Sequence, residues 1–238
     1  MNKQAIVSKL NPIMEGENPG EIIDIARQEL SENLMMTTAF GYSGIVLLNF
    51  VKAAFPDIPI YFIDTGYHFE ETLKLRLKIM DEWKINIQMV STSRPKAELV
   101  GLMGEKAYNT DPDMCCHYRK VEPLQNLMND DTVWLSATRR DQAITRKNTQ
   151  PIEIDGRGQI KISPLYNWTS EACWTYIRKY DLPYNPLHDQ FYPSIGCYPC
   201  TNPIDEGGDE RSGRWSGSDK VECGLHITAP LEKHDDTI

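Results

Sequence analysis

Four cysteines are the residues of this chain best suited to metal or redox chemistry. Cys115 and Cys116 are adjacent, and Cys197 and Cys200 form a C-x-x-C pair much further along. Four thiolates suit a tetrahedral zinc ion or an iron–sulfur cluster. Adjacent cysteines cannot easily direct both sulfurs at one small ion, whereas a cubane offers them separate iron atoms. The vicinal pair therefore favours a cluster, with zinc, disulfides and unconnected thiols as the alternatives.

The two remaining cysteines stand apart from these pairs. Cys173 lies in an apolar helical pattern, where a small buried side chain is its expected role. Cys223 stands in V-E-C-G-L-H at the end of a glycine-rich stretch. It is either incidental or a nucleophile that a mobile segment delivers to a site, and the nearby Lys220 and His226 favour its thiolate.

Strands that alternate with helices must position these side chains. The apolar stretch 34–40 runs into a glycine loop, and a second apolar stretch, which ends at Pro56, follows as a helix. The pattern then repeats, which indicates parallel strands joined by right-handed crossovers. We expect an open, mostly parallel α/β sheet flanked by helices, with helices over 21–33, 45–55, 70–83 and 169–180 and strands over 34–40, 58–64, 85–90 and 133–137.

Three loops of this pattern are predicted to meet in one place. Open α/β sheets bind ligands beyond the carboxyl ends of their strands. The loops 41–44, 64–68 and 138–147 each follow a predicted strand. The sequence therefore predicts a ligand site at this edge of the sheet.

Composition sets the class of protein and of partner. The 238 residues are 40% hydrophobic and 25% charged, as expected for one large domain with at most a small appendage. A net charge of -9 disfavours nonspecific binding to nucleic acid or an anionic membrane, so an anionic substrate must meet local basic clusters. No apolar run is long enough for a membrane span or a secretory signal, so we expect a cytoplasmic protein with reduced cysteines.

Four motifs together have a very low chance probability. They are D-P-D-M-C-C-H-Y-R-K-V-E-P-L (111–124), R-R-D-Q-A-I-T-R (139–146), P-Y-N-P-L-H-D-Q-F-Y-P-S-I-G-C-Y-P-C-T (183–201) and E-C-G-L-H (222–226). The combination closely resembles the assimilatory adenylyl sulfate (APS) reductases, the iron–sulfur-containing subgroup of the APS/PAPS reductase family. PAPS here is the 3'-phosphorylated form of adenylyl sulfate. Relatives without a cluster share E-C-G-L-H and lack both cysteine pairs.

The resemblance implies a fold, a cofactor and a nucleophile. The fold would be Rossmann-like, of the adenine nucleotide α-hydrolase type. One 4Fe–4S cluster per chain would bind Cys115, Cys116, Cys197 and Cys200, and Cys223 would be the nucleophile. We expect a sulfonucleotide and cluster domain over 1–205 and a flexible tail over 206–238 that carries Cys223.

The resemblance also implies a set of substrate contacts. Lys120 would lie between the cluster and the sulfate. The first loop departs from the S-F-S-G of many relatives, which leaves open the side chain there that meets phosphate. The substrate-binding residues implied are Gly41, Tyr42, Ser43, Gly44, Asp64, Thr65, Gly66, Lys120, Arg139, Arg140, Arg211, Arg214 and His226.

The activity implied is the thioredoxin-dependent reduction of adenylyl sulfate to sulfite and AMP through an S-sulfonate on Cys223. This reaction belongs to sulfate assimilation and cysteine biosynthesis, with thioredoxin or a glutaredoxin-like protein as reductant. The first loop holds no Lys or Arg, and Asp64 would repel an added 3'-phosphate, so we expect a preference for APS over PAPS.

Three other interpretations remain. The first is a reductase of PAPS or of both sulfonucleotides. The second is an ATP pyrophosphatase-type enzyme, which is disfavoured because the first loop lacks the Asp-Ser of S-G-G-x-D-S. The third, a noncatalytic iron or zinc sensor, leaves Cys223 unexplained. The sequence predicts neither a nucleic acid nor a membrane partner and leaves the oligomeric state open, a homo-oligomer included.

Overall fold

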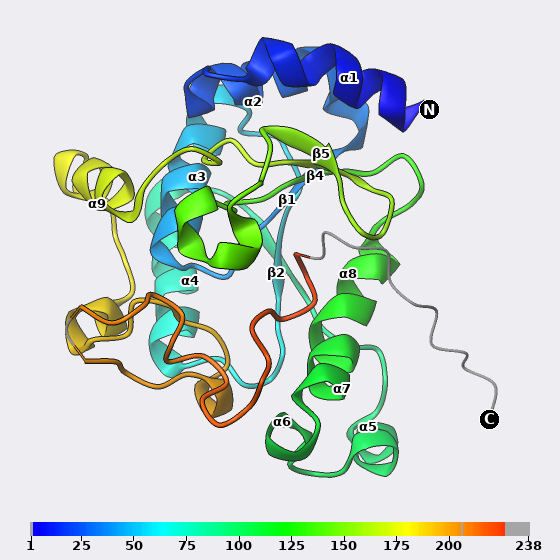
Figure 1. Ribbon diagram of the computed structural model, residues 1–238, viewed down its shortest axis with the longest axis vertical. Coiled ribbons are helices and arrows are strands. Elements are labelled where there is room, and N and C mark those ends of the chain that lie inside the picture. Colours follow the sequence, from blue (N-terminus) through cyan, green and yellow to red (C-terminus); the bar gives the residue numbers. More distant parts are fainter. Residues whose placement is uncertain (1, 206, 227–238) are drawn as a thin grey trace.

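A six-stranded sheet forms the centre of the computed structural model, which describes residues 2–205 and 207–226 (Figure 1). The strand order is β3-β2-β1-β4-β6-β5, and every pair is parallel except the antiparallel pair of β5 and β6. The predicted open, mostly parallel α/β sheet is confirmed. The strands are β1 (Leu34–Thr37), β2 (Ile60–Ile63), β3 (Ile87–Val90), β4 (Val133–Leu135), β5 (Ile152–Ile154) and β6 (Ile160–Ile162).

The alternation of side chains along the central strands gives the sheet two buried faces. Met36, Phe62 and Leu135 belong to the large core cluster on one face. Their neighbours Met35 and Trp134 point to the other face, where a smaller cluster includes a leucine of α8. Both faces are covered, as expected for a parallel sheet.

Helices lie on both sides of the sheet (Figure 1). Helices α3 and α4 flank the strands on one side, and α7 and α8 lie on the other. The helices are α1 (Lys3–Met14), α2 (Pro19–Leu30), α3 (Tyr42–Ala54), α4 (Glu70–Trp83), α5 (Lys96–Met103), α6 (Ala107–Thr110), α7 (Pro112–Cys116), α8 (Glu122–Leu127) and α9 (Ser170–Lys179). Within the described ranges, no helix is long and apolar enough to cross a membrane.

The predicted helices and strands are all present, and most of their ends lie one to three residues from the predicted positions. Helix α4 spans the predicted residues, and α9 begins after Thr169, whose side chain accepts the N–H of Ala172. Helix α3 begins at Tyr42, three residues earlier than predicted, because Gly41 is its N-cap. Strand β1 accordingly ends at Thr37, before the turn that leads into α3.

The sequence patterns predict neither α1 nor the hairpin of β5 and β6. The two elements contact each other: Asn11 of α1 donates to the Ile152 carbonyl at 3.1 Å, and Lys3 donates to the Gly158 carbonyl at 2.7 Å. Helix α1 therefore covers this edge of the sheet, beside the one antiparallel strand of the described chain.

A π-helical turn, His117–Val121, joins α7 to α8. It follows directly on Cys115 and Cys116 and contains Lys120. Single π-turns inside helices often occur at functional sites because they shift the side chains that follow relative to regular α-helical spacing.

The segment 207–226, called here the C-terminal segment, consists mainly of turns and bends and lies against the rest of the molecule. Its end packs on the small core cluster through Leu225, between β2 and α8 in Figure 1. Residues 206 and 227–238 of the predicted tail lie outside the described residues. The division at 205 and 206, and the flexibility of the tail, stay predictions.

Candidate active site

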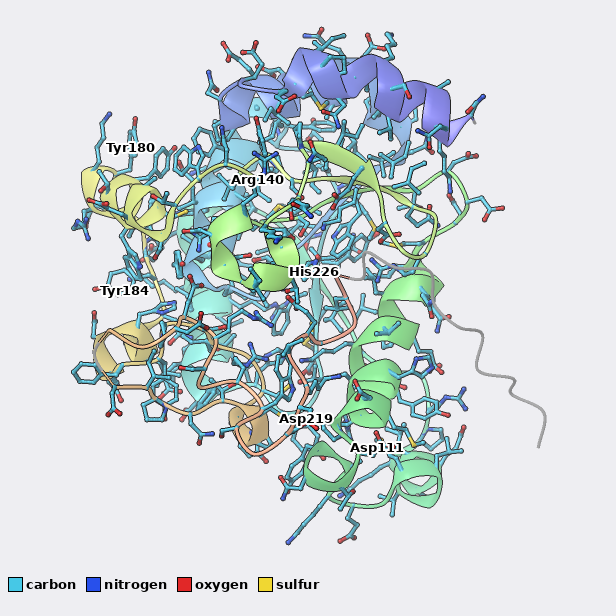
Figure 2. The ribbon with its side chains drawn as sticks, viewed as in Figure 1. Asp111, Arg140, Tyr180, Tyr184, Asp219 and His226 are labelled. Carbon is cyan, nitrogen blue, oxygen red and sulfur yellow. The ribbon has the colours of Figure 1, made fainter. Side chains whose placement is uncertain are left out.

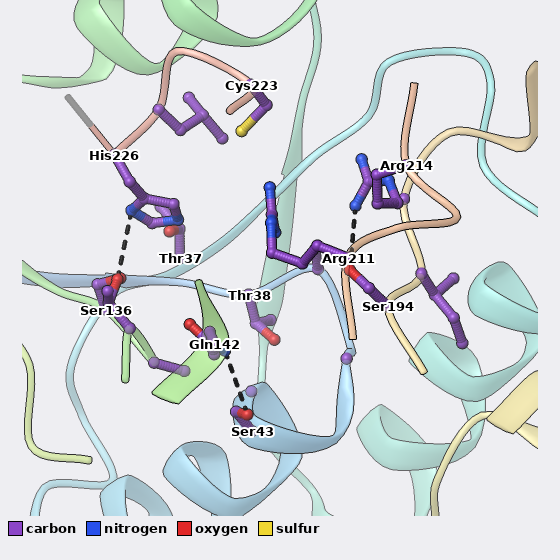
Figure 3. Close-up of a pocket in the computed structure, with 18 of the residues that line it drawn as sticks. Thr37, Thr38, Ser43, Ser136, Gln142, Ser194, Arg211, Arg214, Cys223 and His226 are labelled. Carbon is purple, nitrogen blue, oxygen red and sulfur yellow. Dashed lines mark hydrogen bonds between the residues drawn. The ribbon is translucent and has the colours of Figure 1, made fainter. Parts of the chain in front are cut away.

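A cavity of about 210 Å³ opens at the carboxyl ends of β1, β2 and β4 (Figure 3). All three predicted loops contribute to its lining, so their convergence is confirmed. Two further stretches, 193–197 and 210–226, contribute as well. Figure 3 shows Cys223 and His226 on one side of the cavity and Arg214 with Ser194 on the other.

The turn from β1 into α3 forms one wall of the cavity. Phe40 is buried with a left-handed φ of 58°, and its N–H donates to the Thr38 hydroxyl at 3.1 Å. A Cβ on Gly44 would meet that hydroxyl oxygen at 2.9 Å, so only glycine fits there without movement. Gly41 offers no side chain as cap, which leaves the first-turn N–H groups of α3 available to an anion.

The side chain of Tyr42 belongs to a buried network that leads away from the turn. Its hydroxyl accepts a hydrogen bond from Arg139 and lies 2.8 Å from the Glu210 carboxylate and 3.1 Å from the Ser170 hydroxyl. Burial raises the pKa of Tyr42 far above its ordinary value, and the charge of Glu210 adds to this. Ser43 accepts a hydrogen bond from Gln142 at 3.5 Å.

The loop after β2 places one of its three predicted residues in the cavity wall. Thr65 lines the cavity, and its hydroxyl lies 3.3 Å from the sulfur of Cys197. Asp64 accepts the N–H of Gly66 at 2.8 Å, and Gly66 has a φ of +74°. Asp64 and Gly66 therefore shape the loop that brings Thr65 to the cysteine pair.

The two arginines predicted at the end of β4 do not line the cavity. Arg139 is fully buried and pairs with Asp141 and Glu210 at 3.1 Å each. Arg140, labelled in Figure 2, donates to the Thr149 carbonyl at 2.8 Å and lies over the ring of Tyr166.

Arg146, from the same motif, lines the cavity and was not singled out by the sequence. It forms two hydrogen bonds of 2.8 Å with the carboxylate of Glu222 and a third of 2.6 Å with Gln142. Its place as the last residue of R-R-D-Q-A-I-T-R was the available signal. Other lining residues that sequence reasoning missed are His68, Trp134, Thr138, Gln142 and His188.

The C-terminal segment supplies the predicted cations Arg211 and Arg214. Arg211 donates to Glu222 at 3.1 Å, so this carboxylate lies between Arg211 and Arg146. Arg214 packs on the ring of Trp215 and donates to the Ser194 hydroxyl at 3.4 Å. Both predicted arginines line the cavity, where they can meet an anionic ligand.

Cys223 and Lys120 enter the same cavity. Burial raises the pKa of the Cys223 thiol, but Lys120, the backbone N–H of Leu225 and other cations outweigh burial and bring the pKa below its ordinary value. Burial lowers the pKa of the Lys120 ammonium, yet the surrounding thiols raise it more. The electrostatics thus favour a thiolate beside an ammonium ion.

His226 lies flat on the ring of Trp134, with centroids 5.2 Å apart and 4° between the planes. Its Nδ1 is 3.4 Å from the Thr138 hydroxyl. Burial lowers the pKa of the imidazole far below its ordinary value, and the charge of Arg146 lowers it further. A neutral His226 can therefore act as a hydrogen-bonding group at neutral pH.

The two cysteine pairs lie in one buried region next to the cavity. The N–H of Tyr198, beside Cys197, donates to the Tyr67 carbonyl at 2.8 Å. Arg119 donates to the Thr65 carbonyl at 2.9 Å, which ties the π-turn to the same loop. Burial raises the pKa of the Cys115 thiol to about 11, and the neighbouring thiols of both pairs raise it too.

The chemistry of these donors fits a metal cluster better than it fits independent thiols. Four buried soft donors from two distant segments surround one region, and all six cysteines are free. Arg119 and Lys120 provide positive charge beside them. Across the part of the chain that the structure describes, however, no group of three or more His, Cys, Asp or Glu side chains is arranged to hold a metal ion.

Fold and site together define a class: an α/β protein with a cavity at the carboxyl ends of its parallel strands, lined by several cations and a thiol. A model of the phosphoadenosine phosphosulfate reductase domain matches residues 33–203. The chain belongs to this family. Both cysteine pairs lie inside the matched region, and Cys223 lies beyond it.

Individual relatives agree with this assignment. The chain is 40% identical over 225 residues to the adenosine 5'-phosphosulfate reductase of Halalkalibacterium halodurans, which covers 94% of this chain and 97% of the relative. It is 39% identical over 224 residues to the protein of that name from Staphylococcus epidermidis, with 93% and 92% covered.

Solved structures show the same fold. Phosphoadenylyl-sulfate (PAPS) reductase from Candida auris, crystallised as a phosphate complex, matches with a TM-score of 0.73 and 28% identity, covering 85% of this chain and 98% of that chain. FMN adenylyltransferase of Candida glabrata matches with a TM-score of 0.56 at 13% identity over 91% of this chain and 76% of that chain. The second likeness supports the predicted Rossmann-like nucleotide fold alone.

Proposed function

We propose that this protein reduces adenylyl sulfate to sulfite and AMP. The observation that carries the proposal is the position of Cys223, in a cavity that also contains Lys120, Arg146, Arg211 and Arg214. A thiol among four cations suits attack on an anionic sulfur centre. The names of the bacterial relatives support the same substrate and reaction.

The reaction has two steps. In the first, the Cys223 thiolate attacks the sulfate sulfur, the sulfur–oxygen bond to the phosphate breaks, and AMP leaves with the electron pair. In the second, a dithiol protein of the thioredoxin or glutaredoxin type attacks the Cys223 sulfur, and sulfite leaves. The second thiol of the reductant then releases Cys223 and closes a disulfide, so the dithiol supplies both electrons.

The cavity residues divide the charge of this substrate between them. The first-turn N–H groups of α3, open beside Gly41, suit the phosphate of the nucleotide. Arg211 and Arg214 suit the phosphosulfate oxygens, including the phosphate oxygen that gains charge as the bond breaks, and Lys120 suits the sulfate beside the thiolate. His226, held on Trp134, suits a hydrogen bond to the leaving oxygen.

The cluster belongs to this proposal. Cys115, Cys116, Cys197 and Cys200 would hold one 4Fe–4S cluster per chain, joining the end of α7 to the loop that contains η6 (Tyr198–Cys200). When bound, the cluster supplies a fixed charged group that orders the pocket. Lys120 stays between this region and Cys223, where it orients substrate.

Mass spectrometry and an activity assay test the central proposal. Incubation with adenylyl sulfate, without reductant, should add one sulfonate to the peptide that contains Cys223, and a thiol reductant should then release sulfite. Cys223→Ser should abolish both, whereas Cys173→Ser, which alters a buried thiol outside the cavity lining, should keep both. An adduct on Cys173, or no sulfite from the wild type, would refute the proposed function.

Iron analysis tests the cluster separately. Protein purified without oxygen should be brown and contain about four iron atoms per chain. Stoichiometric zinc without iron would refute the cluster. Serine at any of the four cysteines should lower both the iron content and the stability, because the remaining buried thiolates lose their metal.

Substrate choice is the finest part of the proposal. Asp64 and the uncharged turn before α3 offer no cation to a 3'-phosphate, so we expect kcat/KM for adenylyl sulfate to exceed that for PAPS by at least roughly tenfold. A preference for PAPS is the alternative under test, because the chain is also similar to the PAPS reductase of Candida auris. Equal or reversed values with one thioredoxin would refute this preference and leave the reductase activity in place.

The remaining partner and location assignments also stay with the proposal. We place the enzyme in the cytoplasm, where thioredoxin-type reductants and free thiols occur together. Light scattering of the purified protein tests whether it forms a homo-oligomer.

A further inference from the structure

Arg157 lies in the turn of the β5–β6 hairpin, away from every sequence motif of the site. Asp155 fixes this turn: its carboxylate accepts the N–H groups of Arg157 at 2.9 Å and Gln159 at 3.1 Å. The same carboxylate accepts Nε of Arg157 at 3.0 Å. The arginine side chain is only 4% exposed, so its guanidinium is held in one orientation.

This guanidinium reaches the C-terminal segment just beyond Cys223. Nη2 of Arg157 donates to the Leu225 carbonyl at 2.8 Å, across 68 positions of sequence. The guanidinium also lies 5.0 Å from the ring centroid of Trp134, the ring on which His226 stacks. Arg157 thus contacts the segment directly through Leu225 and indirectly through Trp134.

Contacts hold the chain on both sides of Cys223, and the two sets of contacts differ in their access to a ligand. On the N-terminal side, Glu222 pairs with Arg146 and Arg211, which line the cavity and face the ligand. On the C-terminal side the contact is with Arg157, which is not among the residues that line the cavity. A substrate anion can compete for the first pair, whereas it has no access to the second.

The backbone between the two sets of contacts needs such support. Gly224 has a φ of +78°, and a Cβ at that position would lie 3.1 Å from a side-chain carbon of Val121. The chain therefore turns sharply over the end of the π-turn directly after Cys223. A fixed Leu225 carbonyl defines where this turn ends, and with it the direction of the thiol.

We propose that Arg157 is a positioning residue for the Cys223 thiol: it seats the Leu225 carbonyl and the Trp134–His226 stack so that the thiol stays in the cavity. The effect on turnover rests on the proposed function, in which Cys223 is the nucleophile. The effect of Arg157 on the position of the thiol does not rest on the proposed function, because that position is a property of the protein without substrate.

The test compares Arg157→Ala with Arg76→Ala in the full-length protein. Arg76 is a matched control, since it also donates to a backbone carbonyl, that of Ile87 at 2.9 Å, and also lies near an aromatic ring, but it does so at the opposite edge of the sheet. Iodoacetamide labelling followed by mass spectrometry measures the rate at which Cys223 is alkylated, and hence how exposed its thiol is, without any assay of activity. Calorimetry measures the dissociation constant of AMP and so tests whether the ligand site itself has changed.

We expect Arg157→Ala to accelerate alkylation of Cys223 by about tenfold and to lower kcat by at least roughly tenfold, with KM and the AMP dissociation constant within about twofold of wild type. Arg157→Lys should recover part of both effects, because an ammonium group can still donate to the Leu225 carbonyl. Arg76→Ala should match wild type in alkylation and kcat.

Two results would overturn the proposal. Alkylation and kcat equal to those of Arg76→Ala would show that Arg157 contributes only to the hairpin. A weakened affinity for AMP would show that Arg157 acts on the ligand. If Arg157→Ala does not fold, Arg157→Lys carries the same comparison. Failure of the wild type to release sulfite refutes the proposed function alone, since the alkylation comparison needs no turnover.

Discussion

The cavity has two parts that are built in different ways. The sheet edge, comprising the turn from Thr38 to Gly44 and the ends of β2 and β4, presents mainly backbone groups, hydroxyls and glycines. The C-terminal segment presents longer functional side chains: two charged arginines, Arg211 and Arg214, together with Cys223 and His226. The sheet edge is continuous with the hydrophobic core, whereas most of the C-terminal segment is held by polar contacts.

The difference shows up in the bonds that hold each part. The turn into α3 is fixed by close packing against Thr38, next to the large core. The C-terminal segment is fixed by Glu210 on Arg139, Glu222 on Arg146, and Leu225 on Arg157. A change at the sheet edge should therefore act on the stability of the whole fold, and a change in the segment should act mainly on the reaction.

The largest expected effect follows from breaking the Glu222 pair. Arg146→Ala removes a cation from the cavity and leaves the carboxylate of Glu222, which is mostly buried, with Arg211 as its remaining cation. We expect kcat/KM to fall by about 10² to 10³, roughly 3–4 kcal/mol, in a steady-state assay with adenylyl sulfate. The exposed neighbour Lys147 is the control, and Lys147→Ala should stay within about twofold of wild type.

Equal activities of Arg146→Ala and Lys147→Ala would contradict the division drawn above. They would mean that neither Arg146 nor its pair with Glu222 of the C-terminal segment contributes to the reaction. In that case Lys120, Arg211 and Arg214 would be the cations that meet the substrate.

An intermediate effect is expected from Gly44→Ala at the sheet edge. The new Cβ would meet the Thr38 hydroxyl at 2.9 Å, so the variant should lose about 1–3 kcal/mol of unfolding free energy. Urea denaturation measures this loss. Gly101→Ala, in α5 with nothing within 4 Å of its Cβ, should instead gain up to about 1 kcal/mol, because alanine favours a helix. Similar values for both variants would show that Thr38 can move aside.

The smallest effect concerns pH. Burial raises the pKa of Glu222, but hydrogen bonds and charge from Arg146 and Arg211 outweigh it and bring the pKa below the ordinary 4.5. Such a group adds stability that is complete above pH 4.5 and is lost as the pH falls below that value. Wild type should exceed Glu222→Gln by about 1 kcal/mol at neutral pH, with the difference closing below 4.5.

Urea denaturation of both proteins at several pH values measures the difference. Arg146, Arg211 and Thr145 are the groups that contact Glu222, and of these only the two arginines are charged. A difference that stays constant down to the most acid pH would contradict the assignment of Glu222 as an ionised partner.

The sequence predicted the sheet edge better than the segment, for a physical reason. Helix α4 and the convergence of the three loops follow from local periodicity and from the common direction of parallel strands. The β5–β6 hairpin was not predicted because each of its strands has only three residues, which is too short for a clear periodic pattern. Helix α1 was not predicted because it contains Pro12, and proline usually marks the start or the end of a helix.

Side-chain partners were the least predictable part of the site. Arg139 and Arg140 stand in a motif at the end of β4, yet Arg139 turns to Glu210 and Arg140 to the Thr149 carbonyl. Nothing in the spacing distinguishes them from Arg146, which does reach the cavity. Pairing across long sequence distances decides such outcomes, and one sequence does not contain that information.

The contact between α1 and the β5–β6 hairpin also sets an order of events during synthesis. Helix α1 leaves the ribosome long before its partners, since Asn11 and Ile152 are separated by 141 positions. The same hairpin later receives Leu225, near the end of the described chain. Both ends of the described chain therefore make contacts that need residues 152–162, and the contact beside Cys223 can form only after the hairpin has formed. A growing chain thus completes its sheet before Cys223 reaches its position in the cavity.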